Sequence, residues 1–283
     1  MEIEGLNWEK CARHQNSQTC RFVAHLFLCD GCAVKLQHEC FNDRPPFYQG
    51  LSVDGYCGLC NQRQQVLLRQ WFICQICLGV VLSYPKSFAA SQSVHNFWES
   101  KVRPVLPRLR LDETDTVRLE PFTPGRRSQR TKAATVKTLD FSVLDDSINS
   151  ETPAFFIELK AGPGSIEEMK EFQLDLNDSN DIANVCNASG VPAYIFHAQV
   201  VDEYLPPTRR SIAKGLWWSD CFTLGENLIK VAARRGEDKY AGYYRPTAFS
   251  PIATFVDALK KKSYKQLRNR LASQPLPIRQ NPR

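Results

Sequence analysis

The stretch FFIELKAG, residues 155–162, decides how the second half of the chain is expected to fold. Its aromatic and β-branched residues, followed by small ones, are typical of a buried strand that ends in a turn. Side chains along a strand alternate between two faces, so Glu158 and Lys160 share one face while the apolar residues around them take the other. An otherwise apolar strand therefore carries an acid beside a base.

A second strand is expected just before this one. VKTLDFSVL (136–144) has strand character, and the turn-rich DDSINSETP (145–153) joins it to residues 155–162, so the two predict a hairpin. In that hairpin Asp140 lies beside Glu158 at the same end of the sheet, with Lys160 next to both. Two carboxylates and a lysine are thus expected to converge.

Such a group predicts a site for a hard cation. Neighbouring carboxylates repel each other unless a cation neutralises them, and Mg²⁺ (or Mn²⁺) accepts oxygen ligands while it keeps several waters. Lys160 is expected to orient one of those waters and to help deprotonate it. These parts are the outline of metal-assisted phosphodiester hydrolysis.

Asp140, an 18-residue step and then Glu158-Leu159-Lys160 resemble the D…ExK core of the PD-(D/E)xK, or restriction-endonuclease-like, nucleases. The family places an acidic helix before the hairpin, which the predicted helix 91–103 matches with Glu99, and a helix and a further strand after it. Residues 165–189, which have helical stretches, and VPAYIFHAQVV (191–201) match these. The resemblance spans roughly residues 90–200.

This resemblance implies an α/β fold with a mixed central sheet flanked by helices, and Mg²⁺-dependent cleavage of DNA. Asp140, Glu158 and Glu99 would hold the metal ion, the Leu159 carbonyl would be an additional ligand, and Lys160 would position the attacking water. A role in restriction or another form of genome defence is plausible for such a nuclease. Double-stranded DNA is the expected partner, and a homodimer is possible.

Several residues leave alternatives open. Asp145 and Asp146 lie on or just past the second strand, so either is an alternative to Asp140, although Asp140 followed by FSV fits the family better. A Glu and a Lys on one strand face are also compatible with a solvated sheet edge. Simpler structural roles are expected for a further set, namely Asp175, Asp178, Asp181, His95, His197, Trp217 and Trp218.

Nine of the eleven cysteines lie in the first 77 residues and predict zinc sites. Two residues between ligands let a tight turn aim both at one tetrahedral ion. Four pairs have this spacing, namely CARH (Cys11, His14) and three CxxC pairs, CDGC (Cys29, Cys32), CGLC (Cys57, Cys60) and CQIC (Cys74, Cys77). They combine in chain order into a site of Cys11, His14, Cys29 and Cys32, and a second site of Cys57, Cys60, Cys74 and Cys77. The zinc is expected to be structural, because four protein ligands leave no position for a substrate.

Four further residues, Cys20, His25, His38 and Cys40, provide enough ligands for a third zinc site, although their spacing is irregular. Packing of single Cys or His side chains in the core is the alternative. A disulfide framework is disfavoured, since nine is an odd number and the N-terminus lacks the basic start and apolar stretch of a secretory signal.

The composition, with 43% apolar and 23% charged residues and no apolar run long enough to cross a bilayer, is typical of a globular protein. The missing secretory signal predicts that the protein stays inside a cell. The expected location is the cytoplasm if the source is a prokaryote, or the nucleus if it is a eukaryote. The net charge of +6 is concentrated in two acid-free blocks, within residues 124–137 and after Asp257, which suit a phosphate backbone.

The predicted organisation is therefore a small zinc-binding module (1–85), a nuclease domain (86–260) and a basic C-terminal tail (261–283). The alternative from another class is a non-catalytic zinc-finger adaptor, because the stretch from Cys11 to Cys40 loosely resembles a B-box or other cross-braced zinc fold. A DNA-binding protein with a nuclease-like domain that does not cut is a third possibility.

Overall fold

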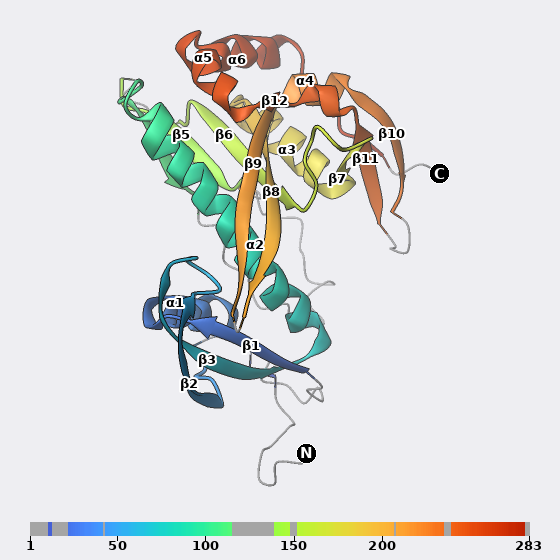
Figure 1. The fold of residues 1–283 in the computed structure, drawn as a ribbon. Coiled ribbons are helices and arrows are strands. Elements are labelled where there is room, and N and C mark those ends of the chain that lie inside the picture. Colours follow the sequence, from blue (N-terminus) through green and yellow to red (C-terminus); the bar gives the residue numbers. More distant parts are fainter. Residues whose placement is uncertain are drawn as a thin grey trace. The chain divides into compact units, whose positions relative to one another are not determined.

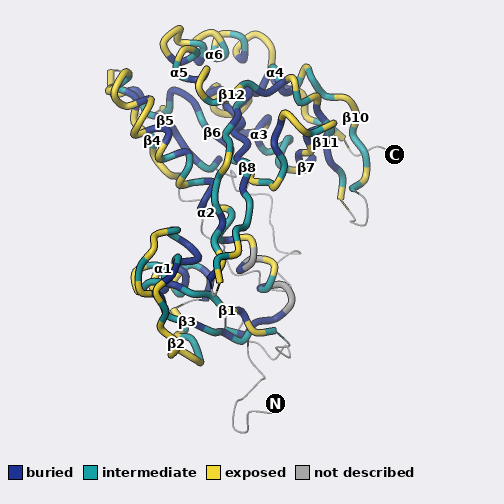
Figure 2. Tube along the Cα trace, viewed as in Figure 1, coloured by how far each residue is buried: buried dark blue, intermediate teal, exposed yellow. Residues whose placement is uncertain are grey.

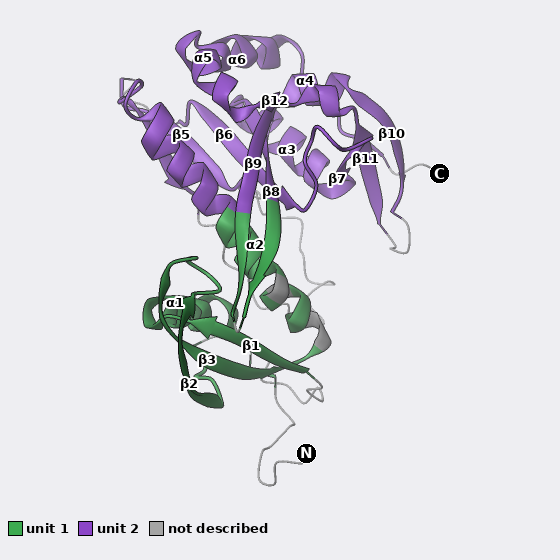
Figure 3. Cartoon of the chain, in the orientation of Figure 1, with its two compact units in different colours: residues 1–89, 117–133, 200–212 green, residues 90–116, 134–199, 213–283 purple. Residues whose placement is uncertain are grey.

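The computed structural model describes residues 11–12, 22–41, 43–114, 139–147, 152–206, 208–234 and 239–280. The chain separates into two compact units, which Figure 3 draws in two colours. The described residues up to 89, together with 200–212, belong to unit 1, and the others belong to unit 2. Helix α2 (Gln75–Phe97) passes from one unit into the other, so the boundary expected near residue 85 stays an interpretation of the sequence.

Unit 1 is built on an antiparallel sheet in the order β1-β3-β2 (Figure 1). Helix α1 begins directly after β1 with Asp30 in its first turn, where a negative charge suits the helix dipole. The elements are β1 (Phe22–Leu28), α1 (Asp30–Phe41), β2 (Tyr48–Tyr56), β3 (Arg63–Ile73) and the first half of α2.

The core of unit 1 combines a few aromatic side chains with many cysteines. Trp71 of β3 stacks on Phe41 of α1 with ring centroids 4.4 Å apart, and both are fully buried. The indole N–H of Trp71 donates to the carbonyl of Arg44 at 3.1 Å. The buried cysteines of this core are Cys11, Cys40, Cys57, Cys74 and Cys77. Thiols therefore fill much of the interior of unit 1.

The main sheet of unit 2 has the order β12-β9-β8-β6-β5-β4. Strands β6 and β8 are parallel, whereas β4 with β5, β5 with β6 and β9 with β12 are antiparallel, so the sheet is mixed. The strands are β4 (Leu109–Glu113), β5 (Phe141–Asp145), β6 (Phe155–Gly162), β8 (Ala193–Leu205), β9 (Thr208–Asp220) and β12 (Ser250–Pro251).

Helices cover both faces of this sheet. Along β8, Ala193 and Ile195 belong to the hydrophobic core that includes α3 (Leu176–Ser189), as the two-residue period of a strand requires. Tyr194 and Phe196 belong to the opposite core, with the end of α2, α5 (Phe255–Lys260) and α6 (Ser263–Ser273). Figure 2 shows the buried residues concentrated in these central strands. Unit 2 is thus a mixed α/β domain with a central sheet flanked by helices.

Smaller elements complete unit 2. The connection from β6 to β8 contains β7 (Phe172–Asp175) and α3, and β7 forms a second sheet in the order β10-β11-β7. Asp220 caps α4 by accepting the backbone N–H groups of Phe222 and Thr223 at 2.9 Å. The other elements are the π-helical turn η1 (Trp98–Val102), α4 (Cys221–Glu226), β10 (Leu228–Ala233), β11 (Tyr240–Tyr244), η3 (Pro246–Ala248) and η4 (Ile252–Thr254).

Residues 261–280, expected as a basic tail, pack on unit 2. Helix α6 buries Tyr264 and Leu271. The amide of Asn187 on α3 donates to the Leu276 carbonyl at 2.9 Å and accepts from its N–H at 2.8 Å, and Asn180 bonds Arg279 in the same two-way manner at 2.9 Å. The seven-residue step from Asn180 to Asn187 spans about 10.5 Å along the helix. The three-residue step from Leu276 to Arg279 spans nearly the same length when the chain is extended. Both asparagines can therefore bond the backbone of this segment at the same time.

The elements expected around the central strand are largely confirmed. FFIELKAG forms β6, and the strand expected at residues 191–201 is β8, although it extends to Leu205. The strand expected at 136–144 is observed as Phe141–Asp145, and residues 115–138 lie outside the described ranges. The helix expected at 91–103 is the last part of the longer α2 and η1. In the described parts of the chain, no helix is both long and apolar enough to cross a bilayer.

Candidate functional site

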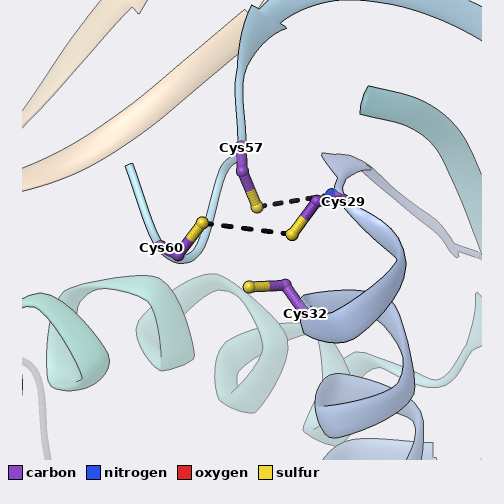
Figure 4. Close-up of side chains that lie close together, drawn as sticks. All are labelled: Cys29, Cys32, Cys57 and Cys60. Carbon is purple, nitrogen blue, oxygen red and sulfur yellow. Dashed lines mark hydrogen bonds between the residues drawn. The ribbon is translucent and has the colours of Figure 1, made fainter. Parts of the chain in front are cut away.

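Four cysteines of unit 1 form a cluster at one end of its sheet. Cys29 and Cys32 lie at the start of α1, and Cys57 and Cys60 lie in the turn between β2 and β3. Their sulfur atoms are within 4.8 Å of one another and turn toward a common centre (Figure 4). The Sγ atoms of Cys29 and Cys60 are 4.0 Å apart, near the roughly 3.8 Å between ligands of a tetrahedral zinc ion with Zn–S bonds of about 2.3 Å. The cluster could hold zinc.

The protonation states of these thiols fit a metal site. A hydrogen bond from the Cys32 thiol and backbone N–H groups, among them that of Cys29, outweigh burial and lower the pKa of Cys57 to about 5. Hydrogen bonding with Cys57, burial and the repulsion of the Cys57 thiolate raise the pKa of Cys32. Without a cation these shifts favour the thiolate at Cys57 and the thiol at Cys32, and a bound dication would stabilise a thiolate at Cys32 as well.

A second cluster joins Cys11, Cys74 and Cys77, which are all buried. The Cys11 thiol lies 3.6 Å from the Cys77 sulfur, and the backbone N–H of Cys74 donates to the Cys11 sulfur at 3.4 Å. Three thiol ligands could hold zinc with one further ligand. His14, predicted as a ligand beside Cys11, lies outside the described residues.

The pairing predicted from chain order is wrong. Cys29 and Cys32 join Cys57 and Cys60, while Cys74 and Cys77 join Cys11, so the two sites are interleaved. The cause is the antiparallel pairing of β1 with β3, in which Leu28 is opposite Leu67 and Phe22 is opposite Ile73. The end of β1 therefore meets the turn that leads into β3, and the end of β3 returns to the start of β1.

The predicted third zinc site does not form among the described residues. His38 is exposed and pairs with Asp43 at 3.0 Å, and His25 is exposed on β1. Cys40 is fully buried in the core of unit 1. None of these three belongs to a cluster of possible metal ligands in the described part of the chain, and Cys20 lies outside that part.

In unit 2 the ExK strand gathers an acid–lysine cluster of Asp140, Glu158, Lys160 and Asp178. Phe141 of β5 is opposite Ile157 of β6, and continuing this register by one residue places Asp140 opposite Glu158. Directly opposed residues of antiparallel strands share a face. The backbone N–H of Leu159 donates to Asp140 Oδ2 at 2.7 Å, which fixes the Asp140 carboxylate against β6.

Lys160 lies between two carboxylates. Its Nζ is 2.7 Å from Glu158 Oε1 and donates to Asp178 Oδ2 at 2.7 Å. Burial lowers the pKa of Lys160, but the attraction of Glu158 and Asp178 outweighs burial, and the net effect is a raised pKa. Lys160 is therefore a fixed positive charge in the structure as it stands, and it pairs with a Glu158 side chain that is only 4% exposed.

Asp178 is the residue of this cluster that sequence reasoning missed. It lies in the first turn of α3 and was expected to be only a helix-start acid. Its 18-residue separation from Lys160 gave no local signal, because the contact depends on how α3 packs on the sheet. The order of elements could have indicated this contact, because a helix that connects two parallel strands must pack on a face of the sheet.

The structure gives other predicted residues different surroundings. Glu99 is exposed on η1, where its carboxylate accepts from Arg103 at 2.9 Å and 3.0 Å. Asp145, an alternative metal acid, accepts from the Ser147 hydroxyl at 2.6 Å and from the Tyr264 hydroxyl at 3.1 Å. These partners give Asp145 a structural role, whereas metal binding by Glu99 stays a prediction.

His197 is buried beside the acid–lysine cluster, opposite Lys160 in the parallel pairing of β8 with β6. Its Nε2 lies 3.0 Å from the Gly164 carbonyl, and burial lowers its pKa. Its ring packs edge-on against Phe172 with centroids 5.4 Å apart. The neutral imidazole is a packed core side chain, in keeping with the structural role expected for it.

Comparisons with known proteins add little to this geometry. No protein-family model matches the chain, and no curated protein matches it either. A solved structure described as D212, a nuclease from a fusselovirus, is similar over 69% of this chain and 98% of that chain, with 12% sequence identity and a TM-score of 0.32. A likeness this low assigns neither fold nor function.

Proposed function

We propose that the chain is a metal-dependent DNA endonuclease that hydrolyses phosphodiester bonds, with its active site at Asp140, Glu158 and Lys160. The observation that carries this proposal is the β5–β6 register, which places the first two carboxylates opposite each other with Lys160 on the same face as Glu158. A metal-dependent phosphodiesterase needs such a group: acids for a hard cation and a cation for the phosphate or the water.

The donor set fits Mg²⁺ or Mn²⁺. Glu158 brings a buried carboxylate, and Asp140 brings a second carboxylate, which the Leu159 N–H holds against β6 through its Oδ2. The Leu159 carbonyl is the proposed additional ligand. Two carboxylates and a carbonyl leave room for the waters that Mg²⁺ retains. When bound, the ion would supply Lewis-acid stabilisation of negative charge on the phosphate.

Lys160 and Asp178 complete the proposed site by positioning groups and neutralising charge. Lys160, held between Glu158 and Asp178, presents a positive charge beside the two metal acids, where it would orient the attacking water or the phosphate oxygens. Asp178 restricts the rotamers of Lys160, because it binds the ammonium group from α3 while Glu158 binds it from β6. Pre-positioned charges of this kind need no rearrangement during the reaction.

The order of elements supports the PD-(D/E)xK assignment as part of this proposal. The acidic turn η1, the hairpin of β5 and β6, the helix α3 and the parallel strand β8 follow one another as that family requires. We further propose DNA as the partner, held partly by the exposed Lys261, Lys262 and Lys265 near the start of α6. The proposal also includes restriction or another defence role, an intracellular location and a homodimer.

Cysteine clusters alone would also suit the non-catalytic zinc-finger adaptor. Cleavage assays of supercoiled DNA in Mg²⁺ and Mn²⁺ discriminate between the two functions. Asp140→Asn and Glu158→Gln are each expected to reduce cleavage by at least about 10³-fold, because each removes a metal ligand. The matched control is Asp146→Asn, because the exposed Asp146 carboxylate forms a surface ion pair with Arg110 at 3.8 Å.

Isothermal titration with Mn²⁺ in the absence of DNA checks metal binding independently of cleavage. Wild type and Asp146→Asn are expected to bind one ion that both active-site variants lose. No cleavage together with no Mn²⁺ binding in the wild type would favour the adaptor. Mn²⁺ binding that depends on Asp140 and Glu158, without cleavage, would indicate a nuclease-like domain that does not cut.

A further inference from the structure

A cavity of about 440 Å³ lies entirely within unit 1 and belongs to neither cysteine cluster nor to the acid–lysine cluster. Strand β1 forms one wall and the first half of α2 forms another, while Asp202 and Tyr204 of β8 and residues 209–211 of β9 form a third. Its size is in the range of ligand sites, about 300–1,000 Å³. Val23, Leu78, Val81 and Pro85 make much of the surface apolar.

The walls of the cavity are tied together by specific bonds. Gly58, between two cysteines of the four-cysteine cluster, donates its N–H to the Phe27 carbonyl of β1 at 2.8 Å. The neighbouring Asn61 amide donates to the Ser211 carbonyl at 2.7 Å. Asp202 accepts from the Ser211 hydroxyl at 2.6 Å and pairs with Lys86 of α2 at 3.1 Å. The cavity is thus a built feature of unit 1.

One wall offers backbone hydrogen bonds. Within the described chain β1 is an outer strand, paired only with β3. The N–H and C=O of alternate residues in an antiparallel strand point to the same side, so Val23 and His25 present theirs to the same edge as the Phe27 carbonyl. On α2, Pro85 has no N–H, and the Val81 carbonyl lacks its usual helical donor. Both residues line the cavity.

We propose that this cavity binds an extended segment of a partner protein, which adds a strand to the edge of β1 and places apolar side chains at alternating positions against α2. A peptide backbone supplies both donors and acceptors for an open strand edge, and the apolar wall selects side chains on one face. Tyr204 and Val23 are large apolar residues that line the cavity while 71% and 38% exposed, as expected of a surface that a partner covers.

Charge argues against nucleic acid as the occupant. The two arginines of the lining are already paired with acids of the same hairpin, Arg209 with Asp202 and Arg210 with Glu203. A phosphate backbone would gain no unpaired cation from them and would be repelled by the acids. The inference does not rest on the proposed nuclease activity, because every residue involved belongs to unit 1.

Selection of phage-displayed random twelve-residue peptides on the full zinc-loaded chain tests this proposal. The most enriched peptide is then synthesised, and its affinity is measured by fluorescence anisotropy. Val23→Asp puts a charge on the apolar wall, and His25→Pro removes an outward N–H from the edge strand, where proline is tolerated. Each is expected to weaken binding by about tenfold or more. The matched control is Val34→Asp, because Val34 is 68% exposed on α1 and outside the lining.

The expected result is a set of peptides with apolar residues at alternating positions, bound equally by wild type and Val34→Asp. Methylation of every second backbone nitrogen of the peptide should also weaken binding by about tenfold, and this readout does not depend on the folding of any variant. The proposal is overturned if no peptide is enriched, or if neither Val23→Asp nor backbone methylation changes affinity. It is also overturned if a random single-stranded DNA oligonucleotide binds and Val23→Asp removes that binding.

Discussion

The cysteine clusters of unit 1 and the acid–lysine cluster of unit 2 gather groups that repel one another when ionised, and they differ in where the balancing charge comes from. In unit 1 thiols surround thiols, and the low pKa of Cys57, about 5, is matched by a raised pKa at Cys32. In unit 2 Lys160 supplies the positive charge between Glu158 and Asp178. The first arrangement needs a metal ion to stabilise thiolates at both of these residues, whereas the second holds one cation of its own, Lys160, beside three carboxylates.

This difference predicts two separate uses of metal. Unit 1 has a core in which cysteines replace many apolar side chains, so metal binding would be part of its folding free energy. Unit 2 has an aromatic core in which Phe155 packs against Tyr194, Tyr264 and Phe255 with centroids 5.1–6.3 Å apart. We therefore expect zinc to stabilise unit 1, and magnesium to be needed in unit 2 only for chemistry.

Zinc removal should have the largest effect. Structural zinc contributes apparent free energies of about 10–16 kcal/mol in small metal-bound modules. A chelator, or Cys57→Ser, is expected to expose the amides of β1 to β3 to hydrogen exchange while β5, β6 and β8 keep their protection. Mass spectrometry under native conditions should count two zinc ions in the wild type. Cys221→Ala, a buried cysteine outside both clusters, is the control and should retain both ions.

Equal protection of β1 to β3 from hydrogen exchange with and without metal would contradict this difference between the units, because it would show that thiol packing alone stabilises unit 1. His14→Ala refines the same experiment at the three-cysteine cluster. If His14 is the fourth ligand, as the CARH spacing predicts, one zinc ion is lost while the four-cysteine cluster keeps the other.

Lys160→Met should have the next largest effect, on rate and not on fold. Roles in orienting water or stabilising charge contribute about 10²–10⁴-fold, so cleavage in saturating Mg²⁺ is expected to fall by that factor while Mn²⁺ binding remains. Single-turnover kinetics on a DNA duplex measure it. Asp178→Asn keeps a hydrogen-bond acceptor for Lys160 but removes the charge, and a loss of about tenfold is expected.

Unchanged single-turnover rates in both variants would show that the ammonium group only neutralises Glu158. Arg103→Met is a matched control for loss of a cation that pairs with an acid, since Arg103 and Glu99 form an exposed pair on one helical turn. Its rate is expected to stay within about twofold, because exposed pairs contribute little. A large loss there would instead support Glu99 as a functional acid.

Asp145→Asn tests a carboxylate that we assign to structure and not to metal. Burial raises the pKa of Asp145, but hydrogen bonds from Ser147 and Tyr264 and the charge of Arg108 outweigh burial and lower it. A carboxyl with a lowered pKa stabilises the folded state above its unfolded pKa, and this contribution is lost as the pH falls below about 4.

The variant should lower the free energy of unfolding of unit 2 by about 1–3 kcal/mol at pH 7, and the difference from wild type should shrink below about pH 4. Urea-dependent hydrogen exchange of β5 and α6 measures it, with Asp146→Asn as the exposed control. An Asp145→Asn protein that is stable but no longer binds Mn²⁺ would contradict the structural role.

The smallest expected effect is that of the exposed lysines near the start of α6. Deletion of residues after 262 is not a clean test, because α6 buries Tyr264 and Leu271. Lys261→Ala and Lys265→Ala should each reduce the slope of log K against log salt by about one and weaken DNA binding about equally for all sequences. Filter binding at several salt concentrations measures both. Slopes equal to that of Lys101→Ala would show that these lysines do not contact phosphate.

Local spacing in the sequence determined several features by itself. The period of two along FFIELKAG places Glu158 and Lys160 on one face, and the observed strand has the expected bounds. Two residues between cysteines fix each CxxC pair as one turn, and each pair does contribute two neighbouring ligands to one cluster. These features follow from bond geometry over a few residues, so they can be predicted without knowing where distant parts of the chain lie.

Only the tertiary structure decided which distant groups meet. The antiparallel register of β1 with β3 interleaved the two cysteine sites, against the order of the chain. The packing of α3 on the sheet brought Asp178 to Lys160, and the docking of residues 274–280 on α3 gave the C-terminal segment its bonds to Asn180 and Asn187. Sequence spacing does not carry this information, because long-range partners are chosen by strand register and by the burial of apolar faces, which depend on the whole chain at once.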